Sequence, residues 1–159
     1  MAHALARLLN CCAIDLDRVI TERERRTPKE IIEQDGEPAF REIESGRLRE
    51  ALGVDSARVI ALGGGAWTMQ RNRDLIAKHE GFTVWLDAPF ELCWQRIVAA
   101  GSERPLAPDE EQARRLYQER RPQYELASLH LLAHGNTTVD ELAATIVRTV
   151  GKDIAGNHF

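Results

Sequence analysis

Two acidic residues stand two positions apart in the stretch IDLD, where Asp15 and Asp17 close an apolar segment. On an extended strand, residues two apart point to the same side, so both carboxylates would face one ligand. One could hold a hydrated Mg²⁺ ion while the other accepts the proton of a hydroxyl group. A strand end whose acids cap the next helix is the plainer alternative, and taken alone the pattern favours it.

An arginine and a glutamate, Arg41 and Glu44, lie three residues apart in the segment QDGEPAFREIE. On a helix these two side chains are neighbours and can form an ion pair. A paired arginine is held in one direction, which suits it to bind a carboxylate through two parallel hydrogen bonds. An ordinary surface ion pair would show the same spacing.

Three consecutive glycines, Gly63, Gly64 and Gly65, follow the apolar segment VIAL. Because they have no side chains, they let backbone N–H groups approach a ligand closely. The spacing is not G-x-G-x-x-G, so it does not predict a dinucleotide site. A tight turn is the alternative, although such a turn rarely needs three glycines.

Two further segments carry arginines beside a proline. In GSERPLAP, Arg104 lies among small residues and prolines, which favours a mobile lid that closes over a phosphate. In RRPQY, Arg120 and Arg121 stand before a proline. For both segments, solvated arginines are the alternative.

The composition is that of one globular domain. The net charge is −4, whereas a nucleic-acid-binding domain is more often basic. No apolar run approaches a membrane span, and the three cysteines have neither disulfide nor zinc spacing, which favours reduced thiols. We therefore expect a single domain over residues 1–159, with 151–159 as a frayed tail, and no nucleic-acid or membrane partner.

Short apolar segments alternate with amphipathic ones, and this alternation predicts an α/β fold with an open parallel sheet flanked by helices. The expected strands are residues 11–16, 57–65, 82–89 and 129–134. The expected helices are residues 4–10, 18–26, 27–53, 72–81, 90–101, 113–127 and 138–151. Thr27, Pro28 and Glu30 form a strong helix start, and Pro122 is expected to interrupt its helix.

Ligands of open parallel sheets bind outside the carboxyl ends of the strands. In this chain that edge would gather Asp15 and Asp17, then the three glycines, then Asp87. Acids and a glycine-rich turn at one edge suit a ligand that carries hydroxyl or phosphate groups.

Five motifs taken in order resemble those of one family. D-x-D, G-E-x-x-F-R-x-x-E, G-G-G-A, R-P-L and R-x-P-x-Y follow one another as in shikimate kinase, over residues 4 to about 150. Each motif is weak alone, but all five in this order are specific. The resemblance implies a three-layer P-loop kinase fold. It also implies MgATP-dependent phosphorylation of the shikimate 3-hydroxyl, a step of chorismate and aromatic amino acid biosynthesis, by a cytoplasmic monomer.

The resemblance implies that five parts of the chain bind shikimate. Asp17 matches the acid that contacts the shikimate hydroxyls, and it is the candidate base. Arg41 and Arg120 match the two arginines that grip the shikimate carboxylate, with Glu44 steadying Arg41. The backbone of Gly63–Gly65 matches the contact to the ring, with Gly64 the main residue.

Two more residues match positions on the ATP side of the family site. Asp15 matches the acid that helps to hold Mg²⁺ through water. Arg104 matches the lid arginine that reaches the phosphates. No residue matches an adenine contact clearly.

One part of the family pattern is absent from the sequence. The family starts with an apolar strand and G-x-x-x-x-G-K-[ST], whereas this sequence opens with MAHALARLLN, which resembles the helix after that motif and has no N-cap residue. We interpret Met1 as a start inside a longer reading frame. Without the phosphate cradle we expect no useful kinase activity from the 159 residues. Without a central strand we also expect marginal stability.

Two alternatives stay open. A non-catalytic relative that binds shikimate or a protein partner would keep every shikimate-side residue. A related small-molecule kinase, such as a gluconate kinase, is the other alternative, although the paired arginines and G-G-G-A favour shikimate.

Overall fold

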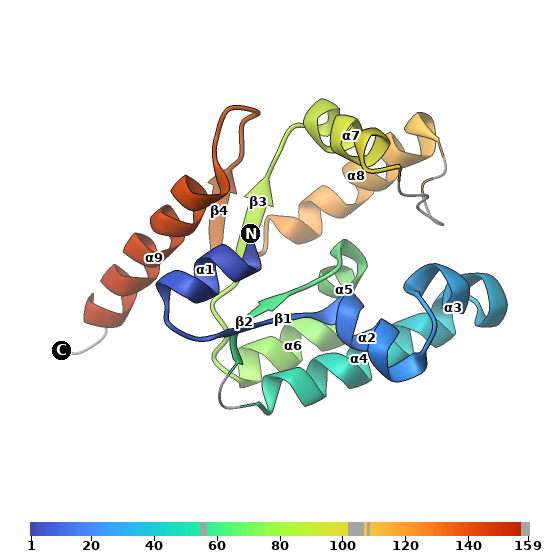
Figure 1. Cartoon of the computed structure of the whole chain (residues 1–159), viewed down its shortest axis with the longest axis horizontal. Coiled ribbons are helices and arrows are strands. Elements are labelled where there is room, and N and C mark those ends of the chain that lie inside the picture. The colour runs from blue at the N-terminus through green and yellow to red at the C-terminus, as the bar shows by residue number, and fades with distance from the viewer. Residues whose placement is uncertain (55–56, 102–106, 108, 157–159) are drawn as a thin grey trace.

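The computed structural model describes residues 1–54, 57–101, 107 and 109–156. Strands and helices alternate along this chain, which confirms the predicted α/β class (Figure 1). The strands are β1 (Cys12–Asp15), β2 (Ala57–Ala61), β3 (Val84–Asp87) and β4 (Leu129–Leu132). The helices are α1 (Ala2–Leu8), α2 (Leu16–Glu24), α3 (Pro28–Asp35), α4 (Glu37–Leu52), α5 (Gly64–Thr68), α6 (Gln70–Lys78), α7 (Phe90–Ala99), α8 (Glu110–Tyr124) and α9 (Val139–Gly156).

The strands form two separate parallel pairs. β1 runs beside β2, with Asp15 opposite Ala61, and β3 runs beside β4, with Asp87 opposite Leu132. Among the described residues no hydrogen-bonded ladder joins β2 to β3. In the part of the chain that the structure describes, the sheet is therefore divided between β2 and β3.

The β3–β4 pair is poorly covered for a parallel sheet. Leu86 is 36% exposed and Leu132 is 60% exposed, whereas parallel strands are normally buried on both faces. A small cluster of Ala88, Ala133 and Leu142 packs at the ends of these two strands. Little apolar area therefore stabilises this half of the sheet, and marginal stability of the chain stays a prediction.

The largest core cluster lies among helices α2, α3, α4, α5 and α6. Its buried side chains are Leu16, Ile20, Ile31, Phe40, Leu48, Ala66 and Ile76. Leu16 and Ile20 are four residues apart and so lie on one face of α2, and both are 0% exposed. This packing fixes α4 and the turn before α5, which carry most of the candidate site.

Helix α3 begins with the capping box that the sequence predicts. The Thr27 hydroxyl accepts a hydrogen bond from the Glu30 backbone N–H at 3.2 Å, and a Glu30 carboxylate oxygen accepts one from the Thr27 N–H at 2.7 Å. We expect Thr27→Ala to lower the free energy of unfolding by about 1 kcal/mol, because alanine lacks the hydroxyl group that accepts the bond from the Glu30 N–H. Urea denaturation measures the change.

Glu33→Ala is the matched control for that prediction, since Glu33 is exposed on the same helix and takes no part in the cap. Its effect should stay within about 0.5 kcal/mol. Equal losses of stability in the two variants would contradict a specific role of the cap.

Two expectations about helix bounds are wrong. The expected helix 27–53 is divided at Gly36, whose φ of 88° lies in the region that favours glycine, so α3 and α4 are separate. Helix α8 continues through Pro122 to Tyr124. Pro122 is exposed and lies in the last turn, where few backbone bonds remain to be lost. Helix α9 runs to Gly156, and the expected fraying of residues 151–159 stays a prediction.

The described helices show no membrane-crossing candidate. None of them combines sufficient length with sufficient apolar character to span a bilayer.

Candidate active site

Arg41 lies on α4 between two carboxylates. Its Nη1 donates to Glu44 at 2.7 Å, and its Nη2 and Nε donate to Glu37 at 2.8 and 3.1 Å. Arg41 is 9% exposed and Glu44 is 1% exposed, so this is a buried ion pair. A guanidinium has five N–H donors, and these bonds use three of them. The remaining two can bind a ligand.

The guanidinium of Arg41 also lies directly against Gly63–Gly65, the residues that lead from β2 into α5 and that we call the glycine turn. A methyl group added at Gly65 would overlap the Nη atoms of Arg41. At Gly64 it would overlap the Tyr124 hydroxyl and lie 3.2 Å from Nη1 of Arg120. Two arginines from different helices therefore approach neighbouring glycines. The contacts of Arg41 with Gly65 and of Tyr124 with Gly64 are possible only because those glycines have no side chain.

Gly63 lies against the acidic side of the same site. A methyl group added there would lie 3.3 Å from an Asp17 carboxylate oxygen and 3.5 Å from a Glu44 carboxylate oxygen. Asp17 comes from the first turn of α2, and it is exposed. The structure thus brings together predicted site residues from α2, α4, the turn into α5, and α8. They are Asp17, Arg41, Glu44, Gly63, Gly64, Gly65 and Arg120.

Burial is the largest influence on the pKa of Glu44. The pKa of this carboxyl is raised, chiefly by burial and also by the negative charge of Asp17, while the hydrogen bond and charge of Arg41 oppose the shift. For Arg41, burial alone would lower the pKa, but the hydrogen bonds and charges of Glu44 and Glu37 raise it. Arg41 therefore stays charged and available to bind an anion.

The raised pKa of Glu44 predicts a pH dependence of stability. An acid whose pKa is higher in the folded state binds more protons there, so its stabilising effect is complete below the ordinary value of 4.5 and is lost as pH rises through the folded-state pKa. We expect the free energy of unfolding, relative to Glu44→Gln, to fall from pH 4.5 upward. Urea denaturation of both proteins between that pH and about pH 7 measures the difference. A constant difference would contradict the shift.

Asp15 takes a different place from the one expected of it. Strand β1 ends at Asp15 and α2 begins at Leu16, so Asp15 and Asp17 do not lie together on one extended strand. The Asp15 carboxylate accepts a hydrogen bond from the Arg18 backbone N–H at 3.2 Å and caps α2. The helix-capping alternative therefore holds for Asp15, because a strand that turns directly into a helix leaves N–H groups to be satisfied.

The expected metal and lid residues are not tested by the geometry. Among the described residues, no three histidine, cysteine or acidic side chains are grouped as metal ligands. Arg104, the expected lid arginine, lies outside the described residues.

Two residues of the site were missed by reasoning from the sequence. Glu37 is four residues before Arg41 on one helix, and this spacing is itself a signal for an ion pair. Tyr124 is four residues after Arg120, so both side chains reach Gly64 from one face of α8.

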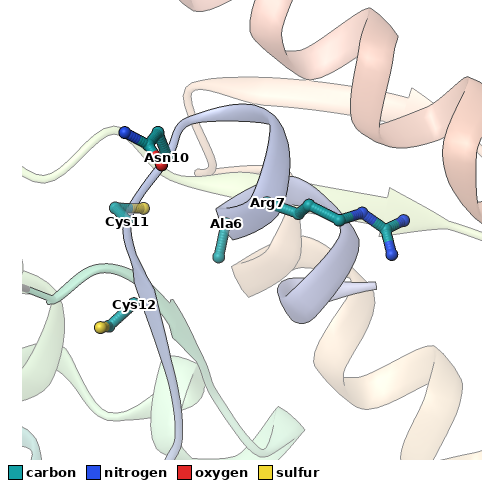
Figure 2. Close-up of a pocket in the computed structure, with 5 residues that line it drawn as sticks. All are labelled: Ala6, Arg7, Asn10, Cys11 and Cys12. Carbon is teal, nitrogen blue, oxygen red and sulfur yellow. The ribbon is translucent and has the colours of Figure 1, made fainter.

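A shallow hollow of about 350 Å³ lies at the opposite end of β1 from Asp15 (Figure 2). It is lined by Ala6, Arg7, Asn10, Cys11 and Cys12. The two cysteine side chains point to opposite sides of the chain, and both are free thiols. The hollow thus includes none of the residues gathered around the glycine turn.

Comparison with known proteins decides the family. The family model for shikimate kinase matches residues 1–151. The chain is 39% identical to a shikimate kinase of Cereibacter sphaeroides, over 92% of this chain and 73% of the relative. It is 30% identical to a shikimate kinase of Nostoc sp., over 94% of this chain and 82% of the relative. The chain belongs to the shikimate kinase family.

A solved shikimate kinase has the same fold. The structure of the Acinetobacter baumannii enzyme in complex with shikimate matches with a TM-score of 0.85 and 31% identity, over 96% of this chain and 85% of that one. The P-loop kinase architecture and the phosphotransferase assignment are therefore confirmed for this member of the shikimate kinase family. The roles of individual residues stay predictions.

Proposed function

We propose that this shikimate kinase chain binds the carboxylate of shikimate between Arg41 and Arg120, above the glycine turn. One observation carries the proposal: guanidinium groups from α4 and α8 meet at the backbone of Gly64 and Gly65. Two cations at one turn suit a carboxylate, since arginine binds that planar group with paired hydrogen bonds. The complex of the Acinetobacter baumannii relative with shikimate supports the same ligand.

Asp17 is the proposed base of this site. Its carboxylate lies beside Gly63, the residue before the two glycines that the arginines approach. A ring bound by its carboxylate at the arginines would extend toward Asp17 and place a hydroxyl group near it. An ionised aspartate can accept the hydroxyl proton as the oxygen attacks a phosphoryl group. Glu44 cannot replace it, because its carboxylate is buried and bound to Arg41.

ATP is the phosphoryl donor of the family, and Mg²⁺ is the metal we propose beside it. Asp15 is exposed at the end of β1, which suits contact through water because Mg²⁺ keeps several of its waters in such sites. When bound, the ion would neutralise phosphate charge. Arg104 is the proposed lid residue, outside the described part of the chain.

The 159 residues contain no G-x-x-x-x-G-K-[ST] segment. The backbone and lysine of that segment hold the phosphates of ATP in P-loop enzymes. We therefore propose that these 159 residues by themselves bind shikimate but transfer phosphate at a rate lower by at least about 10³-fold than an ordinary shikimate kinase. We also infer a cytoplasmic monomer, since one chain supplies every residue of the proposed carboxylate site.

Titration of the purified chain with shikimate tests the proposal, followed by tryptophan fluorescence or calorimetry. Gluconate serves as the competing ligand, and a coupled assay measures turnover with ATP and Mg²⁺. We expect saturable binding of shikimate, weaker binding of gluconate, and no turnover above background. Absence of shikimate binding would overturn the proposed site. Ordinary turnover would overturn the expected loss of activity.

A further inference from the structure

Arg121, the residue after Arg120, is held by an acid at the end of β3. Its Nη1 and Nη2 donate to the two carboxylate oxygens of Asp87 at 2.9 and 3.0 Å, which is a bidentate pair. Nη1 also donates to the Tyr117 hydroxyl at 3.1 Å. The Asp87 side chain is only 12% exposed, whereas the Arg121 side chain is 39% exposed, so the acid is the more buried partner of the pair.

Aromatic side chains connect this ion pair to the glycine turn. The Arg121 guanidinium lies 4.8 Å from the ring centroid of Trp85, also on β3. The Trp85 ring in turn lies 5.9 Å from the ring of Tyr124. Tyr124 is the residue whose hydroxyl contacts Gly64. One face of β3 therefore holds α8 through Arg121 and Tyr124 together.

Adjacent residues on a helix point about 100° apart. With Arg121 bound to Asp87, the rotation of α8 about its axis is fixed, and Arg120 then points toward Gly64. A rotation of this helix would move the Arg120 guanidinium away from the turn. Sites of this kind depend on exact positioning, because a displacement of about 1 Å can lower the rate of an enzyme on the order of 100-fold.

We propose that Asp87 is a positioning residue for carboxylate binding: through Arg121 it orients α8 so that Arg120 points at the shikimate carboxylate. The proposal rests on the function proposed above for Arg120. It also accounts for the acid at the end of β3, which the sequence places at the ligand edge of the sheet but the roles inferred from the family leave unused.

A second contact keeps α8 docked when Asp87 is changed. The Trp67 indole N–H donates to the Gln123 carbonyl at 2.8 Å and joins α5 to α8. Asp87→Asn also leaves no buried charge behind, because Arg121 is 39% exposed and can be solvated. The variant should therefore fold with a reoriented α8, and a thermal melt checks this.

The test compares the affinity for shikimate with that for shikimate methyl ester, whose neutral ester cannot form the arginine pair. Asp87→Asn should weaken shikimate binding on the order of 10-fold, the scale of coupling within one hydrogen-bonded network, and should not change methyl ester binding. Arg120→Ala is the reference, and adding Asp87→Asn to it should have no further effect. Glu91→Gln is the matched control, since it removes a different ion pair of α8, to Arg114 at 3.1 Å.

Each outcome decides the proposal. Equal weakening of both ligands by Asp87→Asn would make Asp87 merely structural, and an unchanged affinity for shikimate would show that Arg120 does not depend on it. Either result overturns the inference while leaving the proposed carboxylate site in place. If the unaltered chain does not prefer shikimate to the ester, both the inference and the carboxylate site are overturned.

Discussion

Replacement of Arg41 by alanine is expected to weaken shikimate binding on the order of 100-fold or more. The variant removes one of the two cations proposed to hold the carboxylate, and truncating one partner of a buried charge pair costs about 2–5 kcal/mol. Calorimetric titration with shikimate measures the loss. Arg47→Ala is the matched control, because Arg47 also lies on α4 and also binds two carboxylates, those of Glu24 and Glu50. Its removal should leave the affinity unchanged.

Arg41→Ala has a second effect, on stability. It leaves Glu44 buried without its cation, and breaking such a pair costs about 3–5 kcal/mol. The double variant Arg41→Met/Glu44→Leu keeps the prediction testable, since apolar replacement of both partners of a buried ion pair is often neutral or stabilising. It should fold and still fail to bind shikimate. Retained affinity in this folded variant would contradict the role of Arg41.

Gly65→Ala is expected to lower both shikimate affinity and stability. The added methyl group would overlap the Arg41 guanidinium, so either that side chain or the turn must move. Overpacking of this kind costs about 1–3 kcal/mol, and displacement of the Arg41 guanidinium should weaken binding on the order of 10- to 100-fold. Thermal melting and shikimate titration measure the two effects.

Gly46→Ala is the control for this substitution. Gly46 lies inside α4, and a methyl group added there meets no atom within 4 Å. Alanine should stabilise the helix by up to about 1 kcal/mol and leave binding unchanged. If Gly65→Ala behaved like this control, the close approach of Arg41 to the turn would not matter for the site.

Local patterns in the sequence were sufficient for much of the fold. Four short apolar segments predicted the strands, and the Thr27 cap appears as expected, because it depends on residues three apart. The ion pair of Arg41 with Glu44 has the same local origin. Features that depend on distant contacts were less predictable. Pro122 did not stop its helix, because it lies in the last turn of α8 and its missing N–H group costs little there.

The family was also accessible from the sequence, through five motifs in order, and the family model over residues 1–151 confirms it. Tertiary structure alone decided which neighbours the motifs have. No spacing rule predicts that Arg41 lies flat against Gly65, or that Tyr124 reaches Gly64. These contacts join elements far apart in the chain, and only the packing of α4 and α8 around one turn creates them.

Asp15, Asp17 and Asp87 show the same division most clearly. The sequence by itself determined that acids stand at the ends of two apolar strands. Only the tertiary structure decided their partners: Asp15 caps α2, Asp17 lies beside Gly63, and Asp87 binds Arg121. The physical reason is that residue type sets which partners a carboxylate can accept, whereas the packing of helices against strands decides which of them comes within hydrogen-bond distance.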